Sequence, residues 1–294
     1  MKILVTGGAG YIGSHTTLAL LEAGYEVVVL DNLCNSSEAA LHAVEGICGK
    51  SAWMIRGDVC DRALLDRIFR EHNIEAVLHF AGLKAVGEST AQPLRYYDNN
   101  VAGTVNLCQV MAEFGVKQLV FSSSATVYGD AKNMPIREDA PRSATNPYGQ
   151  SKLMLEYILA DLQASDPSWR IAILRYFNPV GAHPSGLLGE SPQGIPNNLL
   201  PFVAQTAVGR RPYVSVYGSD YPTPDGSGVR DYLHVMDLAQ GHVAALVHHA
   251  SDHGFHAYNL GTGQGYSVLE VLKAFSASAG FDIPYQLAAR RPGD

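Results

Sequence analysis

The stretch Tyr148-Gly-Gln-Ser-Lys152 places a phenol and an ammonium group four residues apart. Pro147 suits the first turn of a helix, and apolar residues follow at helical spacing as far as Leu162, so both side chains lie on one helical face. A tyrosine ordinarily titrates near a pH of about 10, and an adjacent cation favours its phenolate form. We therefore predict that Tyr148 shuttles protons and that Lys152 lowers its pKa. A pair on the helix surface is the alternative that these two residues alone leave open.

Ser124 is predicted to supply a hydroxyl for the same reaction. It ends the run Phe121-Ser-Ser-Ser124, at the carboxyl end of an expected strand, and the runs Arg56-Gly-Asp58 and His79-Phe-Ala-Gly82 follow two neighbouring strands. The carboxyl ends of parallel strands meet at one edge of a sheet, so these groups converge on one crevice. Ser124 can then bond a substrate oxygen and relay a proton. His79 is expected to be a hydrogen-bonded core residue, because the phenol already fills the role of base.

A glycine-rich turn opens the chain: Val5-Thr-Gly7-Gly-Ala-Gly10-Tyr-Ile-Gly13 joins an apolar strand to a helical pattern. Gly7, Gly10 and Gly13 allow a tight turn and let a pyrophosphate approach the amides at the start of the helix. A second apolar strand ends on Asp31, eighteen residues after Gly13, where a carboxylate can accept both ribose hydroxyls of an adenosine. No Arg follows Asp31 directly to hold a 2′-phosphate, so the pattern predicts NAD in preference to NADP.

The elements that position these groups alternate along the first half of the chain. Apolar runs predict strands near 2–6, 26–30, 52–56, 76–80 and 117–122, and helical patterns lie near 11–23, 61–71 and 95–114. This alternation predicts an α/β protein with a Rossmann-type, doubly wound parallel sheet. From about residue 180 the sequence is rich in Pro and Gly, which predicts a smaller, loop-rich lobe. We expect residues 1–177 to form an NAD-binding domain, with 230–256 returning to it, and 178–294 to form the substrate lobe.

The 294 residues carry a net charge of −7 and no long run of Lys and Arg, which argues against nucleic-acid binding. The first strand follows Met1 and Lys2 at once, and no apolar stretch reaches about 18 residues, so we expect a cytoplasmic protein without membrane contact. Four cysteines lack a Cys-x-x-Cys spacing and are expected to be reduced. The run His248-His-x-x-x-His253-x-x-His256 is not expected to bind metal, because no familiar ligand spacing is completed there.

Taken together, the glycine turn and the Tyr148-x-x-x-Lys152 motif resemble the extended short-chain dehydrogenase/reductase family. Within that family the resemblance is to the nucleotide-sugar epimerases, and it runs from residue 2 to the end of the chain. The stretches that carry it are Asp31–Ser36, His79–Ser89, Tyr96–Val101, Phe121–Gly129, Leu174–Pro184 and Gly228–Leu238.

This resemblance implies that UDP-galactose and UDP-glucose are interconverted by an enzyme that keeps NAD tightly bound. Tyr148 would take the proton of the sugar 4-hydroxyl while a hydride moves from C4 to NAD. The resulting 4-ketose would turn in the site and receive the hydride on its opposite face. Ser124 would assist as the hydroxyl partner, and Lys152 would bind the nicotinamide ribose. A homodimer is also implied, with the helices near 95–114 and 150–164 as its candidate interface.

The resemblance also implies binding residues by position. For NAD these are the glycine turn with Tyr11 and Ile12, the segment Asp31, Asn32, Leu33, Cys34, Asn35 and Ser36, the pair Asp58 and Val59, the loop Phe80, Ala81, Gly82, Leu83 and Lys84, and Asn99, Ser124, Tyr148, Lys152 and Phe177. For the UDP-sugar they are Lys84, Ser124, Tyr148, Asn178, Asn198, Leu199, Val216, Tyr217, Arg230, Arg291 and Asp294.

Three alternatives stay open at this point. The substrate can be another nucleotide sugar, for example an N-acetylated one. A dehydratase would need an Asp-Glu pair after the strand-end Thr126, but Val127 and Tyr128 follow it. A non-catalytic NAD-binding protein would ordinarily lack Tyr148 and Lys152. The family usually continues for several tens of residues beyond position 294, so the substrate lobe is expected to be truncated and its sugar pocket open on one side.

Overall fold

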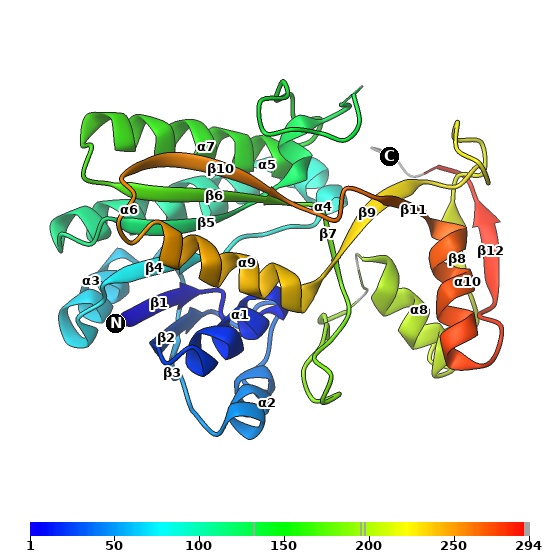
Figure 1. Ribbon diagram of the computed structural model, residues 1–294, viewed down its shortest axis with the longest axis horizontal. Coiled ribbons are helices and arrows are strands. Elements are labelled where there is room, and N and C mark those ends of the chain that lie inside the picture. Colours follow the sequence, from blue (N-terminus) through cyan, green and yellow to red (C-terminus); the bar gives the residue numbers. More distant parts are fainter. Residues whose placement is uncertain (132, 195, 197, 291–294) are drawn as a thin grey trace.

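The protein is built around a central sheet of seven parallel strands (Figure 1). The structure, a computed structural model, describes residues 1–131, 133–194, 196 and 198–290. The strand order is β10-β6-β5-β4-β1-β2-β3. The order reverses between β1 and β4, and such a reversal opens a crevice at the carboxyl ends of the strands. The strands are β1 (Lys2–Thr6), β2 (Glu26–Asp31), β3 (Trp53–Arg56), β4 (Ala76–His79), β5 (Gln118–Ser124), β6 (Arg170–Tyr176) and β10 (Gly254–Leu260).

Helices cover both faces of this sheet, as the alternating sequence pattern predicted. Strands β1 and β2 are nearly continuous runs of Val, Ile and Leu because both of their faces are buried. One core cluster lies under α1 (Tyr11–Glu22), α2 (Ala39–Cys48) and α9 (Val235–His248). The other lies under α3 (Arg62–His72), α6 (Gly103–Glu113) and α7 (Pro147–Ser165). The architecture is therefore the predicted doubly wound α/β fold.

The region predicted as one helix near 95–114 is divided into three pieces. It comprises α5 (Pro93–Tyr96), a π-helical turn η1 (Tyr97–Ala102) and α6, and the short helix α4 (Val86–Ala91) precedes it. π-Helical turns are rare and are found frequently at functional sites. A short 3₁₀ helix, η2 (Ala125–Tyr128), follows β5 directly. Both irregular turns lie next to the carboxyl ends of β4 and β5.

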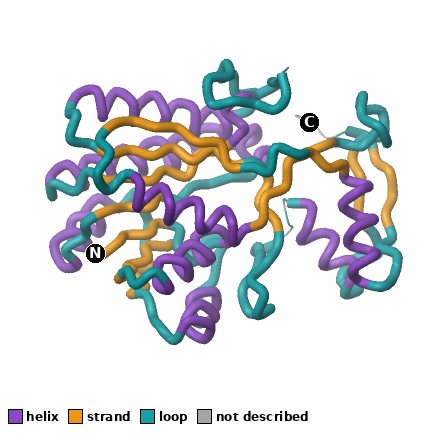
Figure 2. Tube along the Cα trace, viewed as in Figure 1, coloured by secondary structure: helices purple, strands orange, loops and turns teal. Residues whose placement is uncertain are grey.

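A smaller lobe is built from two further sheets (Figure 2). Strands β7 (Asn178–Val180), β9 (Val229–His234) and β11 (Gly265–Ser267) form one sheet, and β8 (Val214–Tyr217) pairs with β12 (Tyr285–Ala288). Helices α8 (Leu199–Ala207) and α10 (Val268–Ala279) pack around a small core that includes Val203, Val216 and Leu272. Ser267 and Glu270 form a capping box at the start of α10.

The chain forms part of the smaller lobe and then returns to the large sheet. After β9, helix α9 packs against α1, and β10 joins the edge of the large sheet beside β6. The returning part therefore extends to Leu260, four residues beyond the stretch that the sequence suggested. None of the helices in the described ranges is long and apolar enough to span a bilayer.

Candidate active site

Helix α7 begins at the crevice and carries both residues of the Tyr-Lys motif. Asn146 caps the helix by accepting a hydrogen bond from the Gly149 amide at 2.9 Å, and Pro147 occupies the first turn. Tyr148 and Lys152 are 8% and 5% exposed, which excludes the alternative of a surface pair. The Lys152 Nζ donates to the Ser122 carbonyl at 2.8 Å and lies 4.8 Å from the centre of the Phe121 ring. The motif therefore faces the end of β5.

The electrostatics of Tyr148 differ from the prediction. Burial raises the pKa of the phenol, and the interaction that opposes this rise is a hydrogen bond with the Ser124 side chain, not the Lys152 cation. Burial also lowers the pKa of Lys152 to about 8, although Glu156 opposes that change. Sequence spacing placed the two groups on one face but did not reveal how completely both are removed from water.

Ser124 lies at the end of β5 and is almost fully buried. Its Oγ accepts a hydrogen bond from the Thr126 amide at 3.2 Å and so caps η2. Behind it, the Tyr176 hydroxyl and the Ser122 hydroxyl lie 2.8 Å apart, which closes the site from the side of β6. The carboxyl ends of β5 and β6 and the start of α7 are thus brought together, although the sequence analysis predicted no strand at the position of β6.

His79 is held in the core between two threonines. Its Nδ1 lies 2.6 Å from Thr6 Oγ1, and its Nε2 lies 2.8 Å from Thr104 Oγ1. Burial, with a smaller contribution from Lys152, lowers the pKa of His79 to about 3. The ring is therefore neutral at physiological pH and tied at both nitrogens, in agreement with a structural role.

The glycine turn forms a cradle at the start of α1. Gly7 has a φ of +72°, and a Cβ on Gly13 would lie 2.1 Å from the Gly7 carbonyl oxygen, so both positions need glycine. No side chain caps α1, whose N-cap residue is Gly10. The first amides of the helix, at Tyr11 and Ile12, therefore offer donors to an anionic group such as a pyrophosphate.

Asp31 ties this turn to the loop that follows β2. Its carboxylate accepts hydrogen bonds from the Ala9 amide at 3.0 Å, the Leu33 amide at 2.9 Å and the Ser36 hydroxyl at 2.8 Å. A carboxylate can accept about four hydrogen bonds or more, so a ribose hydroxyl can still be received. The arrangement fits the adenosine end of a dinucleotide, with the exposed residues Cys34 and Asn35 at its rim.

Asp58 and Asn32 form the next part of the same wall. The Asn32 Nδ2 donates to Asp58 Oδ2 at 2.8 Å, and the Cys60 amide donates to Oδ1 at 2.9 Å. Burial favours a higher pKa for Asp58, but these hydrogen bonds outweigh it and hold the pKa below its usual value. Asp58 therefore stays an acceptor at neutral pH, beside the buried Val59.

The remaining residues predicted to contact NAD follow strands β4 and β6 or lie in the π-helical turn η1. The segment from Phe80 to Leu83 leaves β4 directly, and a Cβ on Gly82 would lie 3.7 Å from the Lys152 Nζ. Phe177 follows β6, where its amide donates to the Leu260 carbonyl at 3.1 Å. The Asn99 Nδ2 donates to Asn100 Oδ1 at 2.9 Å.

Sequence reasoning missed Asn100, which lies inside the π-helical turn and is buried. Its Oδ1 accepts from the Leu83 amide at 2.8 Å, and its Nδ2 donates to the Leu83 carbonyl at 3.0 Å and to Ser151 Oγ at 3.1 Å. One side chain thus joins the loop after β4 to helix α7. No spacing rule identifies such a clamp, because it depends on the irregular turn.

Glu156 was also missed, although its position continues the face of Tyr148 and Lys152 by one more helical turn. It is fully buried and accepts hydrogen bonds from Ser123 Oγ at 2.7 Å, from Arg142 at 2.8 Å and from Arg175 at 3.0 and 2.8 Å. This network fixes α7 against β5 and β6. The four-residue spacing was the signal that could have revealed it.

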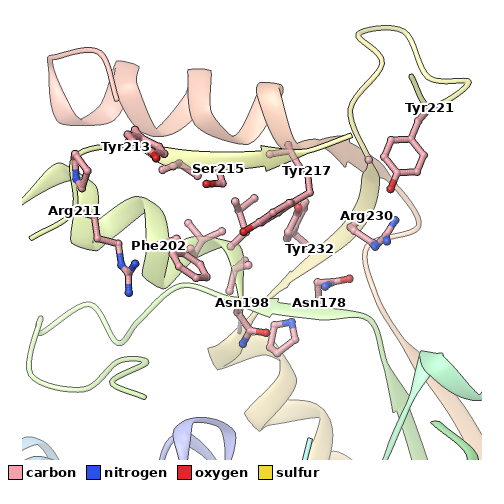
Figure 3. Close-up of a pocket in the computed structure, with 18 residues that line it drawn as sticks. Asn178, Asn198, Phe202, Arg211, Tyr213, Ser215, Tyr217, Tyr221, Arg230 and Tyr232 are labelled. Carbon is pink, nitrogen blue, oxygen red and sulfur yellow. The ribbon is translucent and has the colours of Figure 1, made fainter. Parts of the chain in front are cut away.

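A cavity of about 440 Å³ lies in the smaller lobe (Figure 3). Five residues predicted to bind the nucleotide sugar line it: Asn178, Asn198, Leu199, Tyr217 and Arg230. Aromatic side chains that the sequence reasoning did not single out complete the walls, namely Phe202, Tyr213, Tyr221 and Tyr232. The cavity therefore combines aromatic faces with a cation, which suits a nucleotide base and its phosphates.

Three predicted substrate residues need separate comment. The Val216 side chain is buried in the core of the lobe, so whether this residue contacts the substrate stays a prediction. Its neighbours on β8, Val214, Ser215 and Tyr217, line the cavity. Arg291 and Asp294 lie outside the described residues.

Lys84 lies at the edge between the two lobes. Its Nζ is 3.6 Å from Glu190 Oε1, and Asn198 Nδ2 donates to the same oxygen at 2.6 Å. Burial raises the pKa of Glu190, an effect that the Lys84 charge opposes. Lys84 therefore belongs to a polar link between the loop after β4 and the segment that precedes α8.

Comparisons with known proteins agree with this geometry. The profile described as "NAD dependent epimerase/dehydratase family" matches residues 3–261. A "UDP-glucose 4-epimerase" of Bacillus subtilis (strain 168) is 62% identical over 294 residues, which cover all of this chain and 87% of the relative. A crystal structure of UDP-glucose 4-epimerase from Bifidobacterium longum in complex with NAD+ and UDP aligns with a TM-score of 0.97 at 59% identity, over 100% of this chain and 88% of that one. A structure from Stenotrophomonas maltophila, with bound NAD and formylated UDP-arabinopyranose, also has a TM-score of 0.97, at 50% identity over 100% of this chain and 88% of that one.

Proposed function

The chain belongs to the NAD dependent epimerase/dehydratase family, and from this premise we propose that Tyr148, Ser124 and Lys152 carry its reaction. The enzyme interconverts UDP-galactose and UDP-glucose and uses NAD as its cofactor. The observation that supports the assignment of residues most directly is the burial of the Tyr148 phenol together with Ser124, whose side chain lowers the pKa of that phenol. This pair lies at the carboxyl ends of the parallel strands, the edge of the sheet at which α/β proteins of this kind bind their ligands.

Bound NAD supplies the acceptor and donor for the hydride that leaves and returns to the sugar C4. Tyr148 removes the proton of the 4-hydroxyl and gives it back, so the sugar passes through a 4-ketose. Ser124 donates to the reacting oxygen and stabilises the phenolate. Lys152, anchored on the Ser122 carbonyl, is the cation assigned to the nicotinamide ribose.

A dehydratase reaction is disfavoured by the residues after Thr126. An elimination would need carboxylates at this position, but Val127 and Tyr128 are buried in the core. The Tyr128 hydroxyl is tied to Asn259 Oδ1 at 2.7 Å and to Arg175 at 2.7 Å. No acid or base for loss of water is therefore supplied from η2.

We assign the cavity of the smaller lobe to the UDP group. Arg230 would meet the diphosphate, because a guanidinium matches phosphate oxygens with paired donors. Tyr217 and its aromatic neighbours would hold the uracil face, while Asn178 and Asn198 would orient the sugar between this cavity and Tyr148.

The same proposal includes a homodimer that works in the cytoplasm. Leu94, Met154 and Tyr157 are exposed apolar residues on α5 and α7, and α5 contacts α7, so together they offer a helical surface for a second copy. The four cysteines are free, which is usual in a reducing compartment.

The test is to add UDP-galactose to the purified protein without added NAD and to follow UDP-glucose by proton NMR. Conversion is expected, and Tyr148→Phe should reduce kcat by about 10²- to 10⁴-fold while NAD stays bound, because it removes the proton carrier with little change in volume. Tyr285→Phe, which removes a hydroxyl from an exposed side chain on β12, is the control and should keep full activity. Near-normal turnover in Tyr148→Phe would overturn the assignment.

A further inference from the structure

The turn between α9 and β10 gathers three side chains that are able to bind a metal. His249 follows the last residue of α9, Asp252 lies in the turn, and His256 lies on β10. One ligand atom from each residue lies within 4.8 Å of the other two. The sequence analysis did not expect this run to bind metal because no familiar ligand spacing is completed there, but the fold places Asp252 beside two of its histidines.

The contacts within the cluster are already close to those of a coordination site. His256 Nε2 lies 3.4 Å from Asp252 Oδ2, and His248 Nε2 lies 3.8 Å from the same oxygen. Ligand atoms around a tetrahedral zinc ion are about 3.3 Å apart, given bond lengths of about 2.0 to 2.2 Å. The side chains of Asp252 and His256 are 44% and 39% exposed, so they can rotate over the small distance that is required.

Two ring nitrogens of the cluster lack the partners that buried polar atoms ordinarily have. His249 Nδ1 and His256 Nε2 are buried, and neither has a hydrogen-bond partner within the described part of the chain, although the Asp252 carboxylate lies 3.4 Å from His256 Nε2. The Asp252 main chain favours a higher pKa for His249, but no hydrogen bond of good geometry joins it to His249 Nδ1. Since His249 is only 1% exposed, water cannot easily satisfy this atom either.

The other nitrogen of His249 is held in the way that metal-binding histidines are usually held. Its Nε2 lies 3.0 Å from the Tyr258 hydroxyl. When Nε2 donates its proton to that oxygen, Nδ1 keeps a lone pair directed away from Tyr258. Such an outer partner fixes the tautomer and orientation of a histidine ligand.

We propose that His249, Asp252 and His256 form a Zn²⁺ site, with His248 or water as the fourth ligand. Two imidazoles and one carboxylate are a donor set that zinc accepts in tetrahedral geometry. The site lies at the amino end of β10, away from the crevice and on the side of the molecule opposite the smaller lobe (Figure 1). Its role is therefore structural: it joins the end of α9 to the edge strand of the large sheet.

Binding is tested with the full chain, purified without a histidine tag and freed of metal with a chelator. Zinc is titrated against a chromophoric indicator, and Co²⁺ is added separately to detect the visible absorption of a tetrahedral site. One tight zinc ion per chain is expected. His256→Gln and Asp252→Asn should each lower the affinity at least tenfold and abolish the Co²⁺ spectrum.

His253→Gln is the matched control, because His253 is an exposed residue of the same turn and is not part of the cluster. It should bind zinc as the unaltered chain does. At about a hundredfold excess over Kd, zinc should raise Tm by on the order of 5 °C in the unaltered and control proteins but not in the other two. Conversion of UDP-galactose in each variant verifies folding. Absence of stoichiometric binding, or equal affinity in all variants, would overturn the proposal.

Discussion

The Lys152 ammonium is anchored on the Ser122 carbonyl at 2.8 Å, two residues before Ser124 on the same strand. This contact places a buried cation beside the end of β5. The Ser124 side chain, in contrast, lowers the pKa of the Tyr148 phenol. We therefore assign the effect on the pKa of Tyr148 to Ser124 and the contact with the nicotinamide ribose to Lys152, and each role can be tested by itself.

Ser124→Ala should reduce kcat and move the pH profile. Ser124 opposes the rise in the pKa of Tyr148, so its removal raises that pKa further and leaves less phenolate at any given pH. The rising limb of kcat against pH should shift upward by up to about one unit, the equivalent of one hydrogen bond. Ser165→Ala at the exposed end of α7 is the control. An unshifted limb in Ser124→Ala would contradict the role of its hydroxyl.

Lys152→Met should abolish activity but stabilise the cofactor-free protein below about pH 8. Burial lowers the pKa of Lys152 from 10.5 to about 8, so between these values the unfolded chain holds a proton that the folded chain has released. The free energy of unfolding of the unaltered protein therefore rises with pH across this window, by about 3 kcal/mol in all. Below about pH 8, Lys152 is charged in the folded protein, and the free-energy cost of burying that charge lowers the stability in full.

Urea unfolding at a series of pH values measures this effect. The rise between about pH 8 and 10.5 should be absent from Lys152→Met and present in Lys273→Met, which alters an exposed lysine. Parallel curves for all three proteins would show that the cation is not destabilised by burial.

Glu156→Gln should destabilise the fold by about 3 kcal/mol or more. It keeps the volume of the side chain but removes the negative charge that pairs with Arg175 and Arg142, and so leaves a buried guanidinium without its counter-ion. Asp161→Asn, on the exposed surface of the same helix, should change stability by less than about 0.5 kcal/mol. Equal urea midpoints for the two variants would be inconsistent with this network.

Arg230→Gln should raise KM for UDP-galactose at least tenfold with little change in kcat. The guanidinium lines the cavity assigned to the UDP group, which does not include Tyr148, so it is expected to contribute equally to binding of the substrate and of the transition state. Arg210→Gln, an exposed arginine that does not line the cavity, should leave both constants unchanged. A fall in kcat alone would argue against a diphosphate contact at Arg230.

The sequence predicted those parts of the protein that depend on local patterns. The apolar runs of β1 and β2 are continuous because both faces of the sheet are covered, so their positions follow from hydrophobicity alone. Tyr148 and Lys152 share a helical face by simple geometry. The Ser267 cap follows from local chemistry in the same way.

Features that arise only from packing could not be predicted. The π-helical turn interrupts a pattern that reads as one helix, and Asn100 becomes a clamp only because this turn directs it toward Leu83 and Ser151. The raised pKa of Tyr148 depends on burial, which spacing does not determine. Val216 lies on a strand face whose direction is set by the core of its lobe.

The return of the chain to the large sheet has a consequence for how the protein is made. Gly254 pairs with Arg170 only after the whole segment between them has left the ribosome. The sheet consequently stays one strand short until about residue 260 is available, with the far edge of β6 exposed in the nascent chain. The segment that builds β7, α8, β8 and β9 is therefore synthesised before the large sheet is complete, although every residue assigned to NAD has been made by position 177.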